Sequence, residues 1–342
     1  MRLGSTAVTR FIPTSTVVTL YVAMLLVPLL GLGCHSSKAG LIALIPRTTG
    51  TRLLEQEHQG AEIAAARFGT RIYYNAPDRE DDIEGQISFV DRVSPARFSG
   101  LILSPSHALA LITPVRRALD RGVPIVILGS PLPLPPRDRL HYVLNDEDVG
   151  GKLAAQRVAL LTHGHGTVLV LGENPDIYGI MTRVRSLETA LSQHSPDVRV
   201  IKMQGTFNTL REQQTAERAL KDNPDVKVIV ALMWSSARGA ISVIQDSARH
   251  SAMKVIAFDP DEFPISYSSD IPSLDSVVVE DTRIMGRKAV EIIQQEVEHA
   301  PAPSVVIVKP VLITRDNHDD PSVQALIDFG RTSYKWDRSR VP

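Results

Sequence analysis

The sequence has very little cysteine and almost no excess of charge, and both shortages exclude whole classes of protein. Its 342 residues include one cysteine, Cys34, which excludes an intramolecular disulfide framework and any cysteine-based zinc or iron-sulfur site. The 37 basic and 38 acidic side chains leave a formal net charge of -1. So balanced a chain is not expected to carry a large nucleic-acid footprint or a polybasic membrane patch. With 43% hydrophobic residues it is instead a globular protein with room for about two domains.

Common catalytic signatures are also missing. The sequence contains no Gly-x-Ser-x-Gly elbow, no His-Glu-x-x-His motif and no phosphate-binding Gly-x-x-x-x-Gly-Lys-Ser/Thr loop. His163 and His165 lie close together, but they stand where a helical pattern gives way to a strand. We interpret this pair as the capped end of a helix and not as a metal site. We therefore expect no enzyme activity, no cofactor and no metal.

Residues 1–33 have the features of a secretory signal peptide. Arg2 and Arg10 form a basic start, and residues 17–33 are nearly all apolar and carry no charge. An uncleaved transmembrane helix is an alternative, because about 17 apolar residues reach the lower limit for spanning a bilayer. Under either interpretation, the rest of the chain is exported to the periplasm or the outer cell surface.

Leu32-Gly33-Cys34 resembles the last three positions of the lipobox of bacterial lipoproteins, although Gly31 stands where that motif usually has leucine. The resemblance implies cleavage before Cys34 and acylation of this cysteine, so that lipid chains tether the protein to a membrane. A signal with an incidental cysteine is the remaining alternative. Residues 34–40 are polar and small, and we expect them to form a short flexible tether.

Apolar runs that suit buried parallel strands alternate with helical patterns along the rest of the chain. They fall into two sets, which predict an α/β fold of two similar lobes, each a doubly wound parallel sheet flanked by helices. The first set comprises 41–46, 71–75, 100–104 and 124–128, and the second comprises 167–172, 198–203, 226–233, 254–259 and 276–280.

Two of the intervening segments carry one apolar stripe each, which predicts helices that pack on a sheet. The acidic runs 80–82 and 146–148 are predicted to begin helices, because the helix dipole favours negative charge there. Four prolines within 130–139 exclude a helix or a central strand and predict a loop. The stripes are Ile180, Val184, Leu187 and Leu191 in one segment, and Met285, Ala289, Ile292 and Ile293 in the other.

The order and spacing of several stretches resemble the periplasmic sugar-binding proteins of the ribose-binding type, which share their body with LacI-type repressors. The similarity covers about residues 41–312. The stretches are 41–46, similar to the first strand; 100–106 and 122–126, similar to the third and fourth strands; 145–152, similar to the segment that crosses between lobes; and 257–259, similar to a strand that ends on a ligand-binding acid.

This resemblance implies that two lobes joined by a hinge close around a small polar molecule, usually a monosaccharide. It divides the chain into an N-terminal lobe, 41–144 with about 281–305, and a C-terminal lobe, 145–280 with about 306–314. The tail 315–342 matches no part of the family, and its role is open. The closed form of such proteins is presented to the permease of an ABC transporter or to a membrane sensor.

The resemblance also implies a set of ligand contacts. The family often has aromatic rings at the positions of Leu53 and Leu54, and an acid–arginine pair at the positions of residues 129–130. This sequence lacks both features, but Trp234 can supply a stacking face. The charged members of the set predict a sugar, a sugar acid, a related polyol or a zwitterion as ligand. The expected contacts are Arg47 and Thr51 in the N-terminal lobe, and Arg185, Phe207, Trp234, Asp259 and Glu280 in the C-terminal lobe.

Two other functions compete with transport. A LacI-type repressor carries about 60 residues of DNA-binding domain before its body, whereas only about 40 residues, mostly apolar, precede the first strand here. We therefore expect no nucleic-acid partner. A ligand sensor of the same fold, coupled to a sensor kinase or chemoreceptor, is the alternative that the sequence leaves open.

Overall fold

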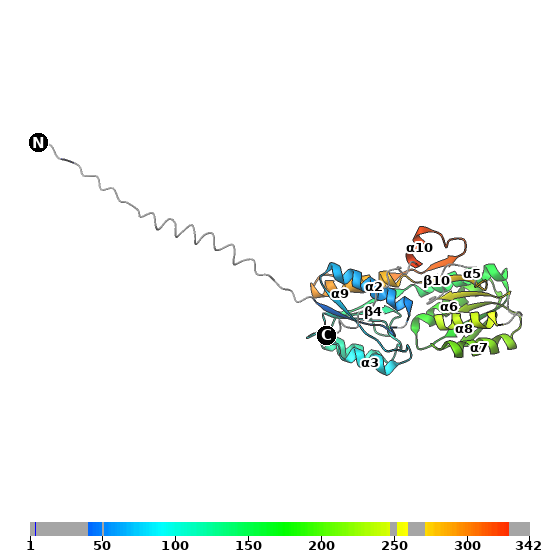
Figure 1. Ribbon diagram of the computed structural model, residues 1–342, viewed down its shortest axis with the longest axis horizontal. Helices are drawn as coiled ribbons and strands as arrows, with labels where there is room; N and C mark the ends of the chain where they lie inside the picture. The colour runs from blue at the N-terminus through cyan, green and yellow to red at the C-terminus, as the bar shows by residue number, and fades with distance from the viewer. Residues whose placement is uncertain (1–3, 5–39, 50, 247–251, 259–270, 328–342) are drawn as a thin grey trace. The chain divides into compact units, whose positions relative to one another are not determined.

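Two six-stranded β-sheets organise the computed structural model, which describes residues 4, 40–49, 51–246, 252–258 and 271–327 (Figure 1). All pairings in the first sheet are parallel, and its strand order is β11-β5-β4-β3-β1-β2. We call this sheet and its helices the N-terminal lobe. Its strands are β1 (Leu41–Ile45), β2 (Arg71–Tyr74), β3 (Gly100–Leu103), β4 (Ile125–Gly129), β5 (Leu140–Asn145) and β11 (Val305–Val308).

The second sheet has the order β12-β10-β9-β8-β6-β7 and, with its helices, forms the C-terminal lobe. Its pairings are parallel except at β12, which runs antiparallel to β10 at one edge. Its strands are β6 (His165–Glu173), β7 (Asp197–Gln204), β8 (Val226–Ala231), β9 (Lys254–Phe258), β10 (Leu274–Val279) and β12 (Val311–Thr314).

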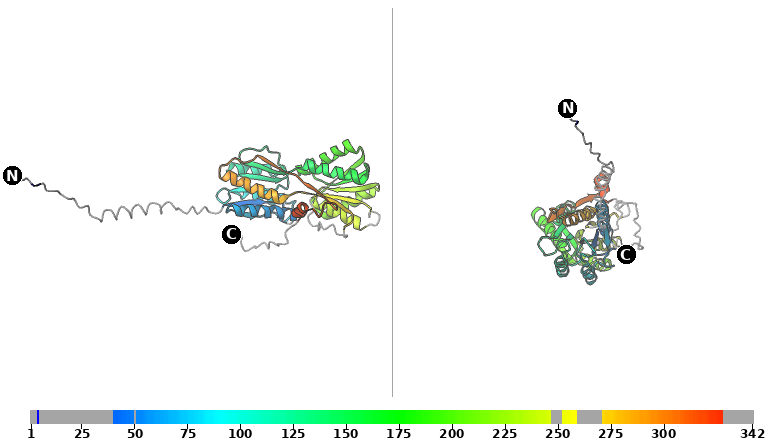
Figure 2. Two further views of the ribbon diagram at one scale, coloured as in Figure 1. Left: turned by 90° about the horizontal axis from the view of Figure 1, so that it is seen from above. Right: turned by 90° about the vertical axis from the view of Figure 1, so that its left-hand side faces the viewer.

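Helices cover both faces of each sheet (Figure 2). In the N-terminal lobe α2 (Arg52–Arg67) and α9 (Thr282–Val297) cover one face, and α3 (Ile83–Asp91) and α4 (Ile112–Asp120) cover the other. In the C-terminal lobe one face carries two helices, and the other carries three. These are α5 (Glu147–Thr162) and α6 (Tyr178–His194) on the first, and α7 (Thr209–Asp222), α8 (Trp234–Gln245) and α10 (Pro321–Ile327) on the second.

The central strands β1, β3, β4 and β9 are largely apolar because both of their faces are buried. Along β1, Ile42 and Leu44 pack toward α2 and α9, whereas Ala43 and Ile45 pack toward α3 and α4. Successive strand residues point to opposite faces, so a strand with helices on both sides needs an unbroken apolar run. The predicted doubly wound α/β architecture is therefore confirmed.

The helical stripes are also buried as predicted. The stripe on α6 packs in the core between α5 and the second sheet, and the stripe on α9 packs beside α2 on the first sheet. Both acidic runs begin helices: Asp82 caps α3 by accepting a hydrogen bond from Gly85 N, and Asp146 caps α5 by accepting one from Val149 N. His163 ends α5 in the left-handed conformation, which confirms the predicted helix cap.

Three strands were not predicted. Strand β5 contains His141, a buried polar residue that hydrogen-bonds Glu296 at 2.8 Å and breaks the apolar pattern. Strands β11 and β12 have four residues each and lie at sheet edges. Val305–Val308 pairs with β5, so the chain leaves the first sheet after Val308, close to the expected lobe boundary at about residue 305.

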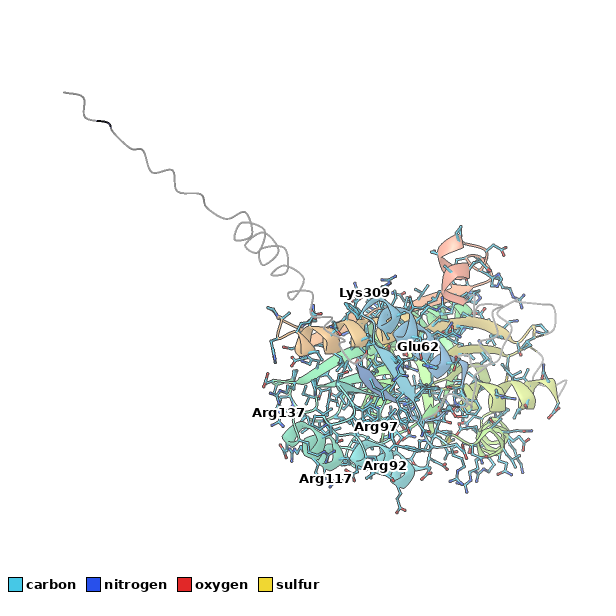
Figure 3. All side chains as sticks on the ribbon, turned by 60° about the vertical axis from the view of Figure 1, so that its left-hand side comes forward. Glu62, Arg92, Arg97, Arg117, Arg137 and Lys309 are labelled. Atoms are coloured by element: carbon cyan, nitrogen blue, oxygen red, sulfur yellow. The ribbon has the colours of Figure 1, made fainter. Side chains whose placement is uncertain are left out.

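The surface of the N-terminal lobe carries paired or stacked cations around α3 and α4 (Figure 3). Arg117 binds Asp91 at 2.7 Å, and Arg97 lies over the ring of Phe98 at 5.2 Å. Asp91 thus compensates the charge of Arg117, whereas Arg97 packs on an aromatic ring.

The predicted signal peptide, apart from Gly4, and Cys34 lie outside the described residues. In the part of the chain that the structure covers, no helix combines the length and apolarity needed to cross a membrane. The tail 315–342, whose role the sequence left open, contains α10, and Val323 and Ile327 of this helix are buried in the core of the C-terminal lobe.

Candidate functional site

A cavity of about 490 Å³ lies where strands of both sheets end. Ligands of doubly wound proteins bind outside the carboxyl ends of the strands, and this volume suits a small molecule. The lining follows β1 and β2 in the N-terminal lobe, and β7 and β8 in the C-terminal lobe. It comprises Thr48, Thr51, Asp78, Arg79, Glu80, Asp81, Thr206, Phe207, Asn208, Arg211 and Trp234.

The C-terminal lobe supplies the aromatic side of this cavity. Phe207 follows β7, and Trp234 begins α8 directly after β8. The indole Nε1 of Trp234 is buried, and no described residue accepts a hydrogen bond from it. A buried donor without an acceptor is unfavourable, so an oxygen of a bound ligand is a suitable partner.

The N-terminal lobe supplies the polar side. The Thr48 hydroxyl donates to the Asp78 carbonyl at 3.1 Å, and Thr51 caps α2 by accepting from Leu54 N at 3.5 Å. Glu80 is 5% exposed, and the Nε of Arg47 lies 4.0 Å from its Oε1. Hydroxyl and carboxylate groups of the N-terminal lobe therefore line the same cavity as the aromatic rings of the C-terminal lobe.

Arg47 contacts the other lobe from behind this lining. Its guanidinium carbon lies 6.0 Å from the centre of the Phe207 ring, within cation–π range. Arg47 thus joins the end of β1 to the loop after β7, although it does not itself line the cavity.

A buried ionic cluster lies at the crossing between the lobes. Arg183 on α6 donates to both carboxylate oxygens of Glu147 at 2.6 and 3.0 Å, and to Glu280 at 2.8 Å. It also donates to the Leu232 carbonyl at 2.7 Å. Asn145 hydrogen-bonds Glu280 as well. The cluster joins the start of α5, the end of β10 and the strand end before Trp234, so it orders the backbone beside the cavity.

The structure places Arg185 away from the cavity. Its side chain is exposed on α6, close to the Met181 carbonyl and 5.8 Å from the Tyr178 ring centre. Arg183, two residues earlier, points inward because residues 183, 184 and 187 share the buried side of the helix. Asp259 follows β9 but lies outside the described residues. Glu280 belongs to the ionic cluster and not to the cavity lining.

A second buried network supports the N-terminal side of the cavity. Gln86 is fully buried, and its amide nitrogen donates to the Pro46 and Ser104 carbonyls at 3.1 and 2.9 Å. Its carbonyl oxygen accepts from the backbone and hydroxyl of Ser106. Ser104 in turn donates to Glu57 at 2.8 Å. These bonds tie together the loops that follow β1 and β3.

Burial dominates the ionisation of Glu57. It raises the pKa of the Glu57 carboxyl to about 7, against smaller lowering effects of Ser104, Arg47 and His58. The folded state binds a proton at Glu57 more tightly than the unfolded state does. The protonated carboxyl therefore makes its full contribution to the free energy of unfolding below pH 4.5. That contribution is lost as the pH rises through about 7.

Replacement of Glu57 by glutamine is expected to remove this pH dependence. The free energy of unfolding of the wild type falls as Glu57 ionises, whereas that of Glu57→Gln does not, because glutamine cannot ionise. The difference between the two proteins should therefore shift by about 3 kcal/mol in favour of the variant between pH 4.5 and pH values above 7. Denaturant unfolding of both proteins between pH 4.5 and 8 measures the change. Glu84→Gln, at an exposed position of α3, is the control and should follow the wild-type profile. Parallel pH profiles for Glu57→Gln and the wild type would show that Glu57 ionises normally.

Direct contacts join the two lobes beside the site. Ala108 N donates to the Asp176 carbonyl at 3.0 Å, and Gly179 N donates to the Ser130 hydroxyl at 2.9 Å. His107 lies 3.6 Å from the Asp176 carboxylate. Ser130 therefore serves as a contact between the lobes.

Thr51, Phe207 and Trp234 were predicted from the sequence as ligand contacts, and in the structure all three line one cavity. Sequence reasoning missed Thr48 and the run 78–81, although the strand-end rule that selected Arg47 applies equally after β2. Among the described residues, no group of three or more histidine, cysteine or acidic side chains is arranged to hold a metal ion.

Two lobes that share one cavity at their strand ends define a binding protein that can close on a small molecule. The periplasmic binding protein domain matches residues 42–301, and the chain belongs to this family. It is 21% identical over 239 residues to a D-ribose/D-allose-binding protein of Pseudomonas aeruginosa, which covers 68% of this chain and 74% of the relative. It is 24% identical over 233 residues to the ribose import binding protein RbsB of Bacillus subtilis, covering 68% and 73%.

Solved structures share the fold. A solute-binding protein of an ABC transporter from Agrobacterium vitis, bound to α-D-tagatopyranose, superposes with a TM-score of 0.78 at 21% identity. The match covers 84% of this chain and 99% of that protein. A second solute-binding protein from the same organism, with bound D-fucose, has a TM-score of 0.77 at 21% identity and covers 83% and 99%. The fold is thus that of the periplasmic binding proteins.

Proposed function

We propose that this protein is an extracytoplasmic solute-binding protein that closes on a sugar or a related polyol and delivers it to an ABC transporter. The observation that carries the proposal is the cavity of about 490 Å³, which is lined by Phe207 and Trp234 together with Thr48, Thr51 and Glu80. Sugars have an apolar C–H surface and a ring of hydroxyl groups, and this cavity offers a partner for each.

Closure follows from the division of the lining between the lobes. Thr48 and Thr51 belong to the N-terminal lobe, whereas Phe207 and Trp234 belong to the C-terminal lobe. A ligand stabilises the closed form only through contacts that the open form lacks, and a molecule that touches both walls makes such contacts. The segments that cross between sheets then act as the hinge, with the Arg183 cluster ordering two of them.

The relatives support the chemical class of the ligand. The Pseudomonas and Bacillus proteins are named for ribose or allose, and the Agrobacterium structures hold tagatose and fucose. These are monosaccharides with different patterns of hydroxyl groups. At 21 to 24% identity the class is the appropriate level of the proposal. Asp259, as a carboxylate directly after β9, is proposed as a further contact for ligand hydroxyls.

The location follows from the signal-like N-terminus. We assign lipid modification to Cys34, which would hold the binding protein at the membrane that contains its transporter. Mass spectrometry of the mature N-terminus tests the assignment, and an unmodified Cys34 would contradict it.

Ligand affinity is expected to depend on the two aromatic walls. A thermal-shift screen of sugars, sugar acids, polyols and amino compounds identifies a ligand, and titration calorimetry then measures its affinity. Trp234→Ala and Phe207→Ala should each weaken binding about tenfold or more, because each removes a stacking face. Tyr178→Ala is the matched control, since Tyr178 is 51% exposed and does not line the cavity.

Two further variants test the charged contacts in the same assay. Asp259→Ala should also weaken binding, whereas Arg185→Ala should bind like the wild type because Arg185 lies away from the cavity. Unchanged affinity in Asp259→Ala would remove Asp259 from the proposed site. If no compound in the screen raises the melting temperature, or if both aromatic variants bind like the wild type, the cavity is not the sugar site.

A further inference from the structure

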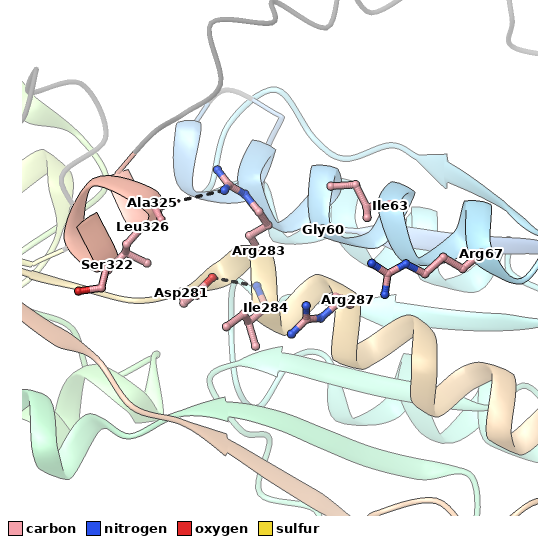
Figure 4. A pocket seen from close by; sticks show the side chains of 10 residues that line it. All are labelled: Gly60, Ile63, Arg67, Asp281, Arg283, Ile284, Arg287, Ser322, Ala325 and Leu326. Atoms are coloured by element: carbon pink, nitrogen blue, oxygen red, sulfur yellow. Dashed lines mark hydrogen bonds between the residues drawn. The ribbon is translucent and has the colours of Figure 1, made fainter. Parts of the chain in front are cut away.

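A second cavity, of about 200 Å³, lies between α2, α9 and α10 (Figure 4). It shares no lining residue with the cavity at the strand ends. Three arginines line it: Arg67 from the last turn of α2, and Arg283 and Arg287 from α9. We propose that this cavity, here named the arginine pocket, binds a doubly charged oxyanion of the phosphate type, either free phosphate or the phosphate monoester of a lipid headgroup.

Among the described residues that line the arginine pocket, basic side chains outnumber acidic ones. The acidic residue of this described lining is Asp281, whose carboxylate caps α9 by accepting from Ile284 N at 2.9 Å. Glu291 lies 3.9 Å from Arg287 but binds Lys288 more closely, at 2.8 Å. The guanidinium groups of Arg67 and Arg287 line the same small cavity, and a dianion there is attracted by both.

Hydrogen-bonding capacity in the pocket is also unused. The Nε of Arg287 is buried and has no hydrogen-bond acceptor among the described residues. Within the same part of the chain, no hydrogen bond or ion pair involves the Arg67 side chain. A buried donor without an acceptor is destabilising, and arginine donates preferentially to the paired oxygens of phosphate and carboxylate groups. A tetrahedral oxyanion offers acceptors to several guanidinium groups at once.

The arginine pocket joins elements of both lobes. Helix α10 is anchored by Val323 in the core of the C-terminal lobe. Its Leu326 carbonyl accepts from Gln56 of α2 at 3.5 Å, and its Ala325 carbonyl accepts from Arg283 at 3.5 Å. Figure 4 shows α10 next to the first turns of α9, at one end of the row of arginines. An anion in the pocket therefore adds contacts where α10 meets the N-terminal lobe, and we expect it to raise the melting temperature.

Calorimetric titration of the full chain in detergent with sodium phosphate, against sodium chloride at equal ionic strength, tests the proposal. We expect saturable binding of phosphate and none of chloride. Arg67→Gln and Arg287→Gln should each weaken phosphate binding about tenfold, because each removes charged donors. Arg218→Gln, an equal change of charge at an exposed position of α7, should bind like the wild type.

A second titration identifies the source of the phosphate group. Vesicles of phosphatidylcholine with phosphatidic acid are compared with vesicles of phosphatidylcholine alone, using the same variants. Arginine-dependent binding to the phosphatidic acid vesicles, with no response to free phosphate, would assign the pocket to a lipid headgroup. Absence of saturable binding in both titrations, or wild-type affinity in both arginine variants, would overturn the proposal. Because neither titration contains sugar, the outcome is independent of the sugar-binding function proposed above.

Discussion

Arg183→Met is expected to lower the free energy of unfolding by about 3–5 kcal/mol, the range for removing one partner of a buried ion pair. Arg183 is 2% exposed and donates to two carboxylates, Glu147 and Glu280, which are themselves buried. Methionine fills part of the volume but leaves both acids without their cation. The Leu232 carbonyl also loses its donor, so the strand end before Trp234 is loosened.

Denaturant unfolding at neutral pH measures this loss. Arg185→Met is the matched control, because the same substitution two residues further along α6 removes an exposed side chain and should change stability by at most about 0.5 kcal/mol. Adding Glu147→Gln to Arg183→Met should recover part of the loss, since one uncompensated charge is removed. Equal stability of the Arg183→Met and Arg185→Met proteins would contradict the importance of the buried cluster.

Gly60→Ala is expected to destabilise the protein by about 3 kcal/mol, at the upper end of the usual effect of overpacking. Helices α2 and α9 cross at two glycines, and each glycine lies against the backbone of the other helix. A Cβ at Gly60 would lie 1.9 Å from the Arg283 carbonyl oxygen, and a Cβ at Gly286 would lie 2.0 Å from the Glu57 carbonyl oxygen. The helices must move apart to admit either methyl group.

The sign of the change in stability distinguishes the effect of packing from the effect of helix propensity. Alanine stabilises an isolated helix by about 1 kcal/mol relative to glycine, so propensity alone predicts a gain. Thermal and denaturant unfolding of Gly60→Ala and Gly286→Ala measure the change. Ala66→Leu, which adds a larger group at an exposed position of α2, is the control and should stay within about 0.5 kcal/mol of the wild type. If Gly60→Ala unfolds at the same denaturant concentration as the wild type, the close crossing is not required.

The sequence predicted the strands that are buried on both faces, such as β1, β3 and β9, and also two partly exposed edge strands, β2 and β7. An unbroken run such as 41–45 has few alternatives to a central parallel strand, because helices on both sides require apolar residues at every position. Strand β5 escaped the same rule, since the partner of His141, Glu296, lies 155 residues further along the chain. Pairing over such a distance is invisible in a local pattern.

The two arginines of α6 show what a local pattern does and does not contain. Arg183 lies three residues after Ile180 and four before Leu187, which places it on the same side of the helix as the predicted apolar stripe. Arg185 lies on another side of the helix. Helical phase therefore indicated the buried arginine. Its partners could not be found in this way, because Glu147 and Glu280 lie 36 and 97 residues away in sequence.

The sequence by itself determined the α/β class, the two lobes, the helix starts at the acidic runs 80–82 and 146–148, and the absence of any disulfide framework. Each of these depends on neighbouring residues or on composition. Only the tertiary structure decided that Phe207 and Trp234 meet Thr48 and Thr51 at one cavity. It likewise decided which arginines became buried ion pairs and which gathered around the arginine pocket. The physical reason is that side-chain burial and charge pairing depend on distances between elements remote in sequence, and these distances exist only once the sheets and helices have packed.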